Sequence, residues 1–199
     1  MPLWVTPDRL TAIGSVGAAI AALGYVGAHW RAEFLFVSSL GIAINWFGDS
    51  LDGSLARYRK VQRPRYGFFL DHSIDAFNGL VFAIGLGLSP FVSMAASLLL
   101  LCSYHLLTIY VLLSAQVDRE FRLTKIYVGP TELRLLAIAF NCAIYVVGPL
   151  SVRLAGSDVS IYSALVAVEA IVFIALFVIE VSVTARRLAR EDGGHRPIA

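Results

Sequence analysis

The sequence has few charged residues for its length. Lys, Arg, Asp and Glu make up 15% of the 199 residues, whereas hydrophobic residues make up 58%. A soluble domain is about 25% charged and about 45–50% apolar. The composition and length therefore predict one membrane-embedded domain covering residues 1–199.

Signals of several other protein classes are missing. The net charge of +2 is too small to indicate nucleic acid as a partner. Cys102 and Cys142 lie in apolar runs without zinc-type spacing, so we predict two small buried side chains. The first apolar stretch follows Asp8 and Arg9 rather than a positive cluster and continues to about Gly27. This length favours a membrane helix over a cleaved signal peptide.

Six stretches approach the roughly 20 apolar residues that a membrane-spanning helix needs. We therefore predict an all-α, polytopic membrane protein with six transmembrane helices. The predicted helices are Leu10–Ala28, Phe34–Ala56, Phe68–Leu88, Phe91–Ala115, Leu133–Leu150 and Ile161–Thr184. Small residues are frequent in the first helix, which predicts close packing against a neighbour.

The basic residues are divided unequally between the two ends of these helices. Of the sixteen Lys and Arg residues, only Arg31 and Arg153 lie on one side. The other side includes Arg119, Arg122, Lys125 and Arg196. Because cytoplasmic loops are enriched in Lys and Arg, both termini are predicted to be cytoplasmic in a multi-pass protein of the cell membrane. Many of these residues could serve only topology and contact with anionic headgroups.

Four aspartates form two pairs at helical spacing. Asp49 and Asp52 are three residues apart, and Asp71 and Asp75 are four apart, so each pair shares one helix face. The pairs end the second predicted helix and begin the third. Helices joined by a short loop are expected to be antiparallel neighbours, and the two faces could then meet on the cytoplasmic side.

Four converging carboxylates repel one another unless cations are bound or protons are taken up. Two divalent ions would balance their charge, and oxygen ligands favour Mg²⁺ or Mn²⁺. Two such ions are a recurring device for displacement at phosphorus. The alternative is a set of interfacial aspartates paired with neighbouring Arg and Lys residues.

The aspartates belong to a longer pattern, D-x-x-D-G-x-x-A-R, nine residues, then G-x-x-x-D-x-x-x-D. This pattern resembles the motif of the CDP-alcohol phosphotransferase family. The resemblance implies six membrane helices, usually in a homodimer, and two metal ions held by the four aspartates. It implies that Gly53, Ala56, Arg57 and Gly67 contact the CDP moiety, and that Asp75 is the general base.

The segment before the first helix, Thr6 to Thr11, looks like the P-N-x-x-T entry of the same family, with Asp8 in place of Asn. The resemblance implies that Asp8 and Thr11 contact the nucleotide. The alternative is helix capping by Thr6 or Asp8, with Pro7 in the first turn.

Candidate acceptor-binding residues lie in the second half of the chain. His105, Glu132 and Arg134 belong to segments that weakly resemble the choline and ethanolamine branch of the family. Structural alternatives are a hydrogen bond from His105 to a neighbouring helix and stabilisation of a helix N-terminus by Glu132. Glu169 lies well inside the sixth predicted helix, where acids are usually functional or paired.

These observations favour an enzyme of phospholipid synthesis with its active site facing the cytoplasm. It would transfer a phosphatidyl group from a CDP-linked donor, CDP-diacylglycerol, to an alcohol acceptor and release CMP. The first alternative is transfer from a soluble CDP-alcohol to a lipid acceptor. The second is a small cation-binding transporter, which would need acids across the whole bilayer depth.

Overall fold

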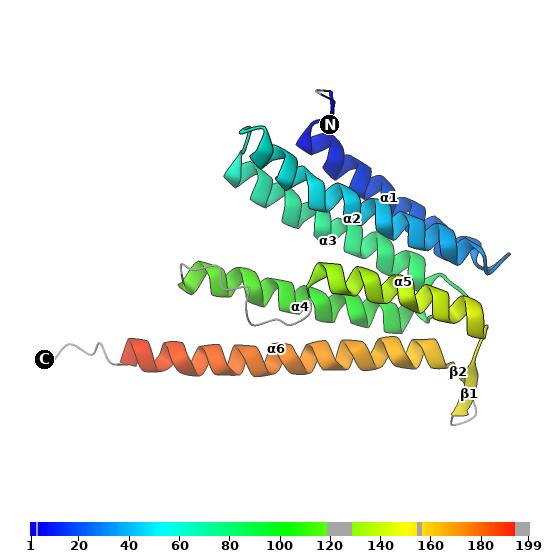
Figure 1. Cartoon of the computed structure of the whole chain (residues 1–199). Helices are drawn as coiled ribbons and strands as arrows, with labels where there is room; N and C mark the ends of the chain where they lie inside the picture. Colours follow the sequence, from blue (N-terminus) through cyan, green and yellow to red (C-terminus); the bar gives the residue numbers. More distant parts are fainter. Residues whose placement is uncertain (3, 119–128, 155–156, 194–199) are drawn as a thin grey trace, which may run out of the picture.

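The computed structural model describes residues 1–2, 4–118, 129–154 and 157–193. Six long helices make up most of this part of the chain (Figure 1). They are α1 (Pro7–Gly27), α2 (Phe34–Tyr58), α3 (Pro64–Gly87), α4 (Met94–Asp118), α5 (Pro130–Val147) and α6 (Ile161–Gly193). A short antiparallel hairpin of β1 (Ser151–Leu154) and β2 (Ser157–Ser160) connects α5 to α6.

All six predicted helical stretches are helical, but they do not all qualify as membrane spans. Among the described helices, α1, α2, α4, α5 and α6 are long and apolar enough to cross a bilayer, and they indicate a membrane-embedded protein. α3 carries the polar residues Asp71, His72, Asp75 and Asn78, which lower its hydropathy. A sixth span therefore stays a prediction.

Small residues bring α1 and α2 into close contact, as the sequence predicts. A Cβ atom on Gly17 would lie 2.5 Å from the backbone nitrogen of Asn45, and one on Gly48 would lie 2.5 Å from the carbonyl oxygen of Leu10. Both distances are far below normal carbon contacts, so only glycine fits there without a helix shift. The side-chain amide of Asn45 donates a hydrogen bond to the Gly14 carbonyl oxygen at 3.0 Å, which stabilises the contact between the two helices.

The loop after α2 reverses the chain within a few residues. Lys60 has a φ of 56°, in the left-handed region that non-glycine residues rarely adopt. The Val61 amide donates to the Ala56 carbonyl oxygen at 3.0 Å, which closes a Schellman-type helix end. Pro64 then begins α3, because proline is well suited to the first helical turn.

The aspartate faces of α2 and α3 meet as expected, but the two helices have more extensive contacts with other helices than with each other. Both helices pack on α1, while α2 also contacts α5 and α3 also contacts α4. A glycine of α3 allows the close approach of α3 to α1: a Cβ atom on Gly85 would lie 2.5 Å from the Cα atom of Ala22. The aspartates of α2 and α3 approach one another through their side chains.

Hydrogen bonds fix α4 alongside α6, with both helices running in the same direction (Figure 1). The Ser93 amide donates to Ser163 Oγ at 2.8 Å near one end. The Tyr110 hydroxyl donates to Glu180 Oε2 at 3.1 Å near the other end. Glu180 therefore has a tyrosine partner from α4.

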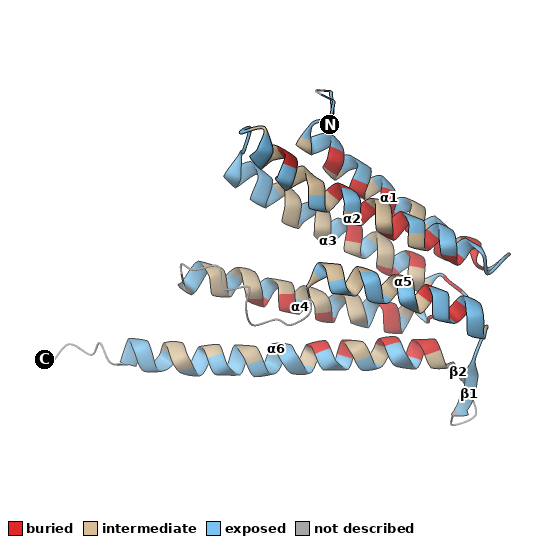
Figure 2. Ribbon diagram, in the orientation of Figure 1, coloured by how far each residue is buried: buried red, intermediate tan, exposed pale blue. Residues whose placement is uncertain are grey.

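Buried positions are concentrated on α1, α2 and the helix ends near the hairpin, whereas most of α6 is exposed (Figure 2). Many exposed side chains are large and apolar, including Leu165, Val168 and Ile171. Lipid-facing surfaces have this character, because a bilayer solvates apolar side chains. Cys102 and Cys142 are also exposed, so the prediction of two buried cysteines is wrong.

Candidate active site

Three carboxylates from two helices converge at one end of the bundle. Ligand oxygens of Asp49 on α2 and of Asp71 and Asp75 on α3 all lie within 4.8 Å of one another. Each side chain is half-buried, and Asp71 and Asp75 share a face because they are one helical turn apart. An all-oxygen donor set of this kind fits a hard divalent cation. We call this set the three-carboxylate group.

An arginine from α5 partly compensates the negative charge of this group. Arg134 Nη1 lies 2.8 Å from Asp49 Oδ2, and the two side chains are 14% and 23% exposed. The sequence analysis placed Arg134 at the acceptor and did not foresee this ion pair. The contact brings the beginning of α5 to the end of α2.

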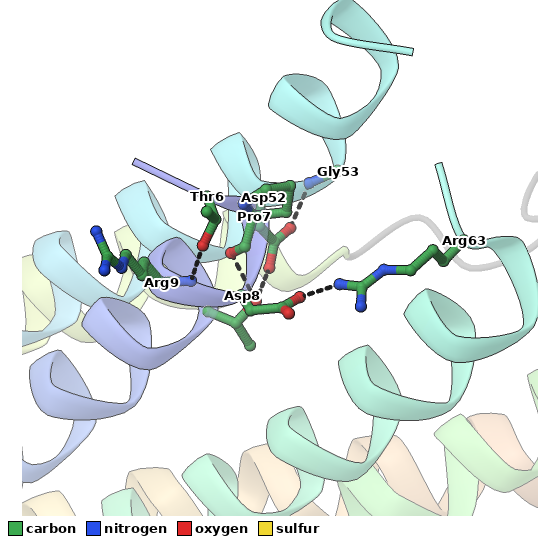
Figure 3. Close-up of polar contacts among 8 residues, drawn as sticks. Thr6, Pro7, Asp8, Arg9, Asp52, Gly53 and Arg63 are labelled. Carbon is green, nitrogen blue, oxygen red and sulfur yellow. Dashed lines mark hydrogen bonds and ion pairs between the residues drawn. The ribbon is translucent and has the colours of Figure 1, made fainter. Parts of the chain in front are cut away.

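Asp52, the fourth predicted metal ligand, is held by α1 instead of joining the three-carboxylate group. Its Oδ2 accepts a hydrogen bond from Thr11 Oγ1 at 2.6 Å, and its Oδ1 accepts one from the Gly53 amide (Figure 3). Thr11, predicted to contact the nucleotide, thereby orients an aspartate. The close approach of α1 and α2 makes this bond possible.

A cavity of about 90 Å³ lies beside Asp52 and Asp71. Most of the residues that the sequence analysis assigned to CDP line it together: Asp8, Thr11, Gly53, Ala56 and Gly67. A Cβ atom on Gly67 would meet no atom within 4 Å, so this glycine opens space instead of tightening a helix contact. Arg57 does not line the cavity; it is exposed and donates to Ser54 Oγ at 3.1 Å.

The entry to α1 combines capping with a contact across the cavity. Thr6 caps the helix by accepting a hydrogen bond from the Arg9 amide, with Pro7 in the first turn (Figure 3). Asp8 forms an ion pair with Arg63, which precedes α3. The hydrogen bond to Asp8 raises the pKa of Arg63 above its usual value. The capping alternative thus applies to Thr6, while Asp8 faces the cavity.

Comparison with known proteins agrees with this arrangement. The sequence model of the CDP-alcohol phosphatidyltransferase family matches residues 4–175. The chain belongs to the CDP-alcohol phosphatidyltransferase family. The match includes both aspartate pairs and the glycines beside them.

One relative of this CDP-alcohol phosphatidyltransferase is a phosphatidylinositol phosphate synthase of Cutibacterium acnes. The two sequences are 36% identical over 84 residues. The matched segment covers 42% of this chain and 38% of the relative, so less than two thirds of the relative's length is represented.

The three predicted acceptor residues do not form one cluster. Glu132 accepts a hydrogen bond from the Gly129 amide at 2.9 Å and so stabilises the beginning of α5, as the structural alternative anticipated. His105 faces α3, where its ring would lie 3.7 Å from a Cβ atom on Gly79. Of the three predicted residues, only Arg134 reaches the three-carboxylate group.

A second cavity, of about 610 Å³, begins at Asp75 and Arg134 and extends between α3, α4, α5 and α6. Its walls are mostly apolar, and Glu169 of α6 is among the few polar residues that line it. Both cavities adjoin the three-carboxylate group: Asp71 lines the smaller and Asp75 the larger.

The sequence analysis missed two residues of the smaller cavity, Arg63 and Tyr66. The Arg63 guanidinium lies 4.1 Å from the centre of the Tyr66 ring, within cation–π range. The available signal was their position within the four residues before Gly67 of the family pattern. Arg119, Arg122, Lys125 and Arg196, which contributed to the topology prediction, lie outside the described residues.

Proposed function

We propose that this protein transfers a phosphatidyl group from CDP-diacylglycerol to the hydroxyl of a polar alcohol and releases CMP in phospholipid synthesis. The observation that carries the proposal is the position of the three-carboxylate group between two unlike cavities. The smaller cavity is lined by the family-pattern residues expected to hold CDP, and the larger is apolar enough for lipid.

The three-carboxylate group fits divalent cations, and Asp49, Asp71 and Asp75 would hold them, with Asp52 adjoining. Mg²⁺ or Mn²⁺ bound there would stabilise the negative charge of a diphosphate. We propose that two such ions bind. Arg134 neutralises part of the charge of Asp49. Thr11 holds Asp52 in place through its hydroxyl.

Asp75 is the proposed general base because it belongs to the three-carboxylate group and also lines the larger cavity. In the proposed step, the acceptor oxygen forms a bond to the phosphorus that carries diacylglycerol. The bond from this phosphorus to the bridging diphosphate oxygen breaks, and its electron pair leaves with CMP. The hydroxyl proton passes to the Asp75 carboxylate.

The test is to incubate purified protein with CDP-diacylglycerol and a panel of polar alcohols, and to measure CMP release and product mass. The relative's name makes inositol phosphate the first acceptor to test. CMP release that depends on one acceptor, together with the matching phospholipid, supports the proposal. If no alcohol elicits CMP release from this donor, the proposal fails.

A second candidate is transfer from a soluble CDP-alcohol to a lipid acceptor. The observation in its favour is that the larger apolar cavity reaches Asp75, where an attacking lipid hydroxyl could be deprotonated. Incubation with CDP-choline or CDP-ethanolamine and diacylglycerol distinguishes the two candidates. A transporter without phosphotransfer would release no CMP in either assay.

The proposed setting is a homodimer in the cell membrane with the three-carboxylate group facing the cytoplasm. The basic residues that follow α2, including Arg59 and Arg63, support the orientation. A single cysteine placed at Lys60 is expected to react with a membrane-impermeant reagent from the cytoplasmic side, and one at Ser157 from the other side. The reverse labelling would contradict the orientation, and light scattering in detergent would test the dimer.

A further inference from the structure

The smaller cavity is too small to enclose the nucleotide that we propose it binds. Its volume is about 90 Å³. Binding sites for small molecules typically have volumes of about 300–1,000 Å³. A nucleoside diphosphate can therefore be enclosed only after one wall of the cavity moves outward. The contacts between the helices that form the walls indicate which wall this is.

The walls that α1 and α2 contribute are joined firmly to each other. Thr11 donates a hydrogen bond to Asp52 at 2.6 Å beside the cavity, and glycines allow close contact farther along the two helices. The Arg59 guanidinium at the end of α2 donates to the carbonyl oxygens of Pro2 at 2.8 Å and Met1 at 3.1 Å. These two helices and the segment before α1 therefore form the fixed side of the cavity.

The wall that α3 contributes is held less firmly. The first buried residue of α3 is Asn78, so none of the residues from Pro64 to Phe77 is buried. The close contact of α3 with α1 at Gly85 lies about 33 Å along the helix axis from Arg63. Segments with few buried contacts open at a low cost in free energy. The beginning of α3 is therefore the wall that can move.

An ion pair crosses the cavity between the fixed wall and the movable one. Arg63, the N-cap residue of α3, pairs with Asp8 in the first turn of α1 (Figure 3). The two side chains are 52% and 47% exposed, so a ligand from the aqueous side can reach both. The contact of the Arg63 guanidinium with the Tyr66 ring keeps it beside the cavity. Breaking the Asp8–Arg63 pair would free the beginning of α3.

The two charges of this pair have opposite effects on an anionic ligand. Among the described residues, Arg63 is the only basic one that lines the smaller cavity. A guanidinium forms strong, charge-assisted hydrogen bonds with phosphate oxygens. Asp8 stands where the family pattern has Asn, and an ionised carboxylate has no hydrogen to donate to a phosphate and repels it. A phosphate that enters the cavity therefore competes with Asp8 for Arg63.

We propose that Arg63 binds a phosphate of the CDP-linked donor, and that it exchanges the Asp8 carboxylate for this phosphate when the donor enters. The Asp8–Arg63 pair closes the cavity in the free protein. In the complex, the donor phosphate replaces Asp8 as the partner that holds the beginning of α3. The inference rests on the proposed function for the identity of the donor. It adds Arg63 to the donor-binding residues and makes Asp8 a competitor of the nucleotide.

The test measures the affinity for CDP by calorimetry in the presence of Mg²⁺. Asp8→Ala is expected to bind CDP roughly two- to fivefold more tightly than the wild-type protein, because an exposed ion pair no longer has to break. Arg63→Gln is expected to bind CDP about tenfold more weakly, because charge-assisted hydrogen bonds to the phosphate are lost. Unchanged or weaker binding by Asp8→Ala would overturn the inference. That result is expected if the pair only stabilises the fold or if Asp8 itself binds the nucleotide.

Thermal unfolding in detergent separates closure of the cavity from simple repulsion of the phosphate by Asp8. Without nucleotide, Asp8→Ala is expected to unfold about 1–3 °C below the wild-type protein, because the free protein loses an ion pair. At saturating CDP the two proteins are expected to unfold at the same temperature, because the pair is already broken in the complex. Equal unfolding temperatures without nucleotide would show that the pair does not hold the cavity closed and would overturn the inference.

Asp158→Ala is the matched control. Asp158 is also an exposed aspartate in an ion pair, with Arg153 at 3.7 Å, but it lies on the hairpin. This variant is expected to keep the wild-type affinity for CDP, and tighter binding would reveal a general charge effect that overturns the inference. Absence of CDP binding by the wild-type protein would contradict the proposed function together with the inference. CDP binding that Asp8→Ala does not tighten would contradict the inference alone.

Discussion

Arg134 of α5 lies 2.8 Å from the Asp49 carboxylate of α2, at the edge of the three-carboxylate group. Since α5 packs on α2, this ion pair couples the position of a helix to the charge of the site. It also gives Arg134 two possible effects, one on the aspartates and one on the acceptor, which a substitution can separate.

Replacing Arg134 with Gln is expected to leave Asp49 without its cation. The cost in unfolding free energy is expected to fall between the roughly 1 kcal/mol of an exposed pair and the 3–5 kcal/mol of a fully buried one. The acceptor KM is expected to rise more than the donor KM, because a guanidinium at the beginning of α5 can bind an anionic acceptor. Chemical denaturation and steady-state kinetics measure the two effects.

Arg153→Gln is the control for this substitution. Arg153 lies 3.7 Å from Asp158 in an ion pair whose side chains are 79% and 68% exposed, away from the three-carboxylate group. Its loss is expected to change neither KM. Equal increases in donor and acceptor KM in Arg134→Gln would contradict a role at the acceptor.

Asp75→Asn is expected to reduce turnover by about 10²–10⁴-fold, the usual contribution of a positioned general base. It is also expected to retain more donor affinity than Asp71→Asn, because Asp71 lines the smaller cavity and Asp75 the larger. Calorimetry with the CDP donor and single-turnover CMP release measure the two quantities. Complete loss of donor binding in Asp75→Asn would identify Asp75 chiefly as a metal ligand.

Removal of divalent cations is expected to abolish activity. The three carboxylates converge within 4.8 Å, and Arg134 supplies only one positive charge near them. EDTA is therefore expected to stop CMP release, and Mg²⁺ or Mn²⁺ to restore it. Full activity in excess EDTA would exclude the metal-dependent form of the proposal.

Lys60→Gly is expected to stabilise the protein. Lys60 adopts a φ of 56°, a conformation that costs an L-residue roughly 1–2 kcal/mol and glycine little. The greater freedom of glycine in the unfolded chain offsets part of this gain, so a net increase of about 0.5–1 kcal/mol is expected. Thermal unfolding in detergent measures it. A decrease would show that the Lys60 side chain contributes more than its backbone conformation costs.

The sequence predicted the helices better than their ends or neighbours. Apolar runs located all six, but α3 begins four residues before the predicted Phe68, because Pro64 starts it. The prediction relied on apolar runs. It therefore missed the charged continuation of α6 to Gly193 and the hairpin that precedes α6. Helix neighbours could not be inferred from loop length, since α2 and α3 each pack mainly on α1 although a short loop joins them.

The candidate site was predictable where it depends on local spacing. The i,i+4 pair Asp71 and Asp75 shares a face, and Asp49 meets it. The positions of Asp52 and Arg134 depend on contacts between helices distant in sequence, with Thr11 of α1 and Asp49 of α2 respectively. Spacing along one helix carries no information about such partners.

The length of α6 has a practical consequence. Its 33 residues extend about 50 Å, whereas the hydrocarbon layer of a bilayer is about 30 Å thick. Figure 1 shows α6 continuing past the end of α4 as one uninterrupted helix. A helical partner protein spliced in phase onto this extension would be carried on a rigid stalk roughly 20 Å clear of the lipid. Such a chimera would offer a fiducial mass for single-particle imaging of an otherwise featureless 21.6 kDa membrane protein.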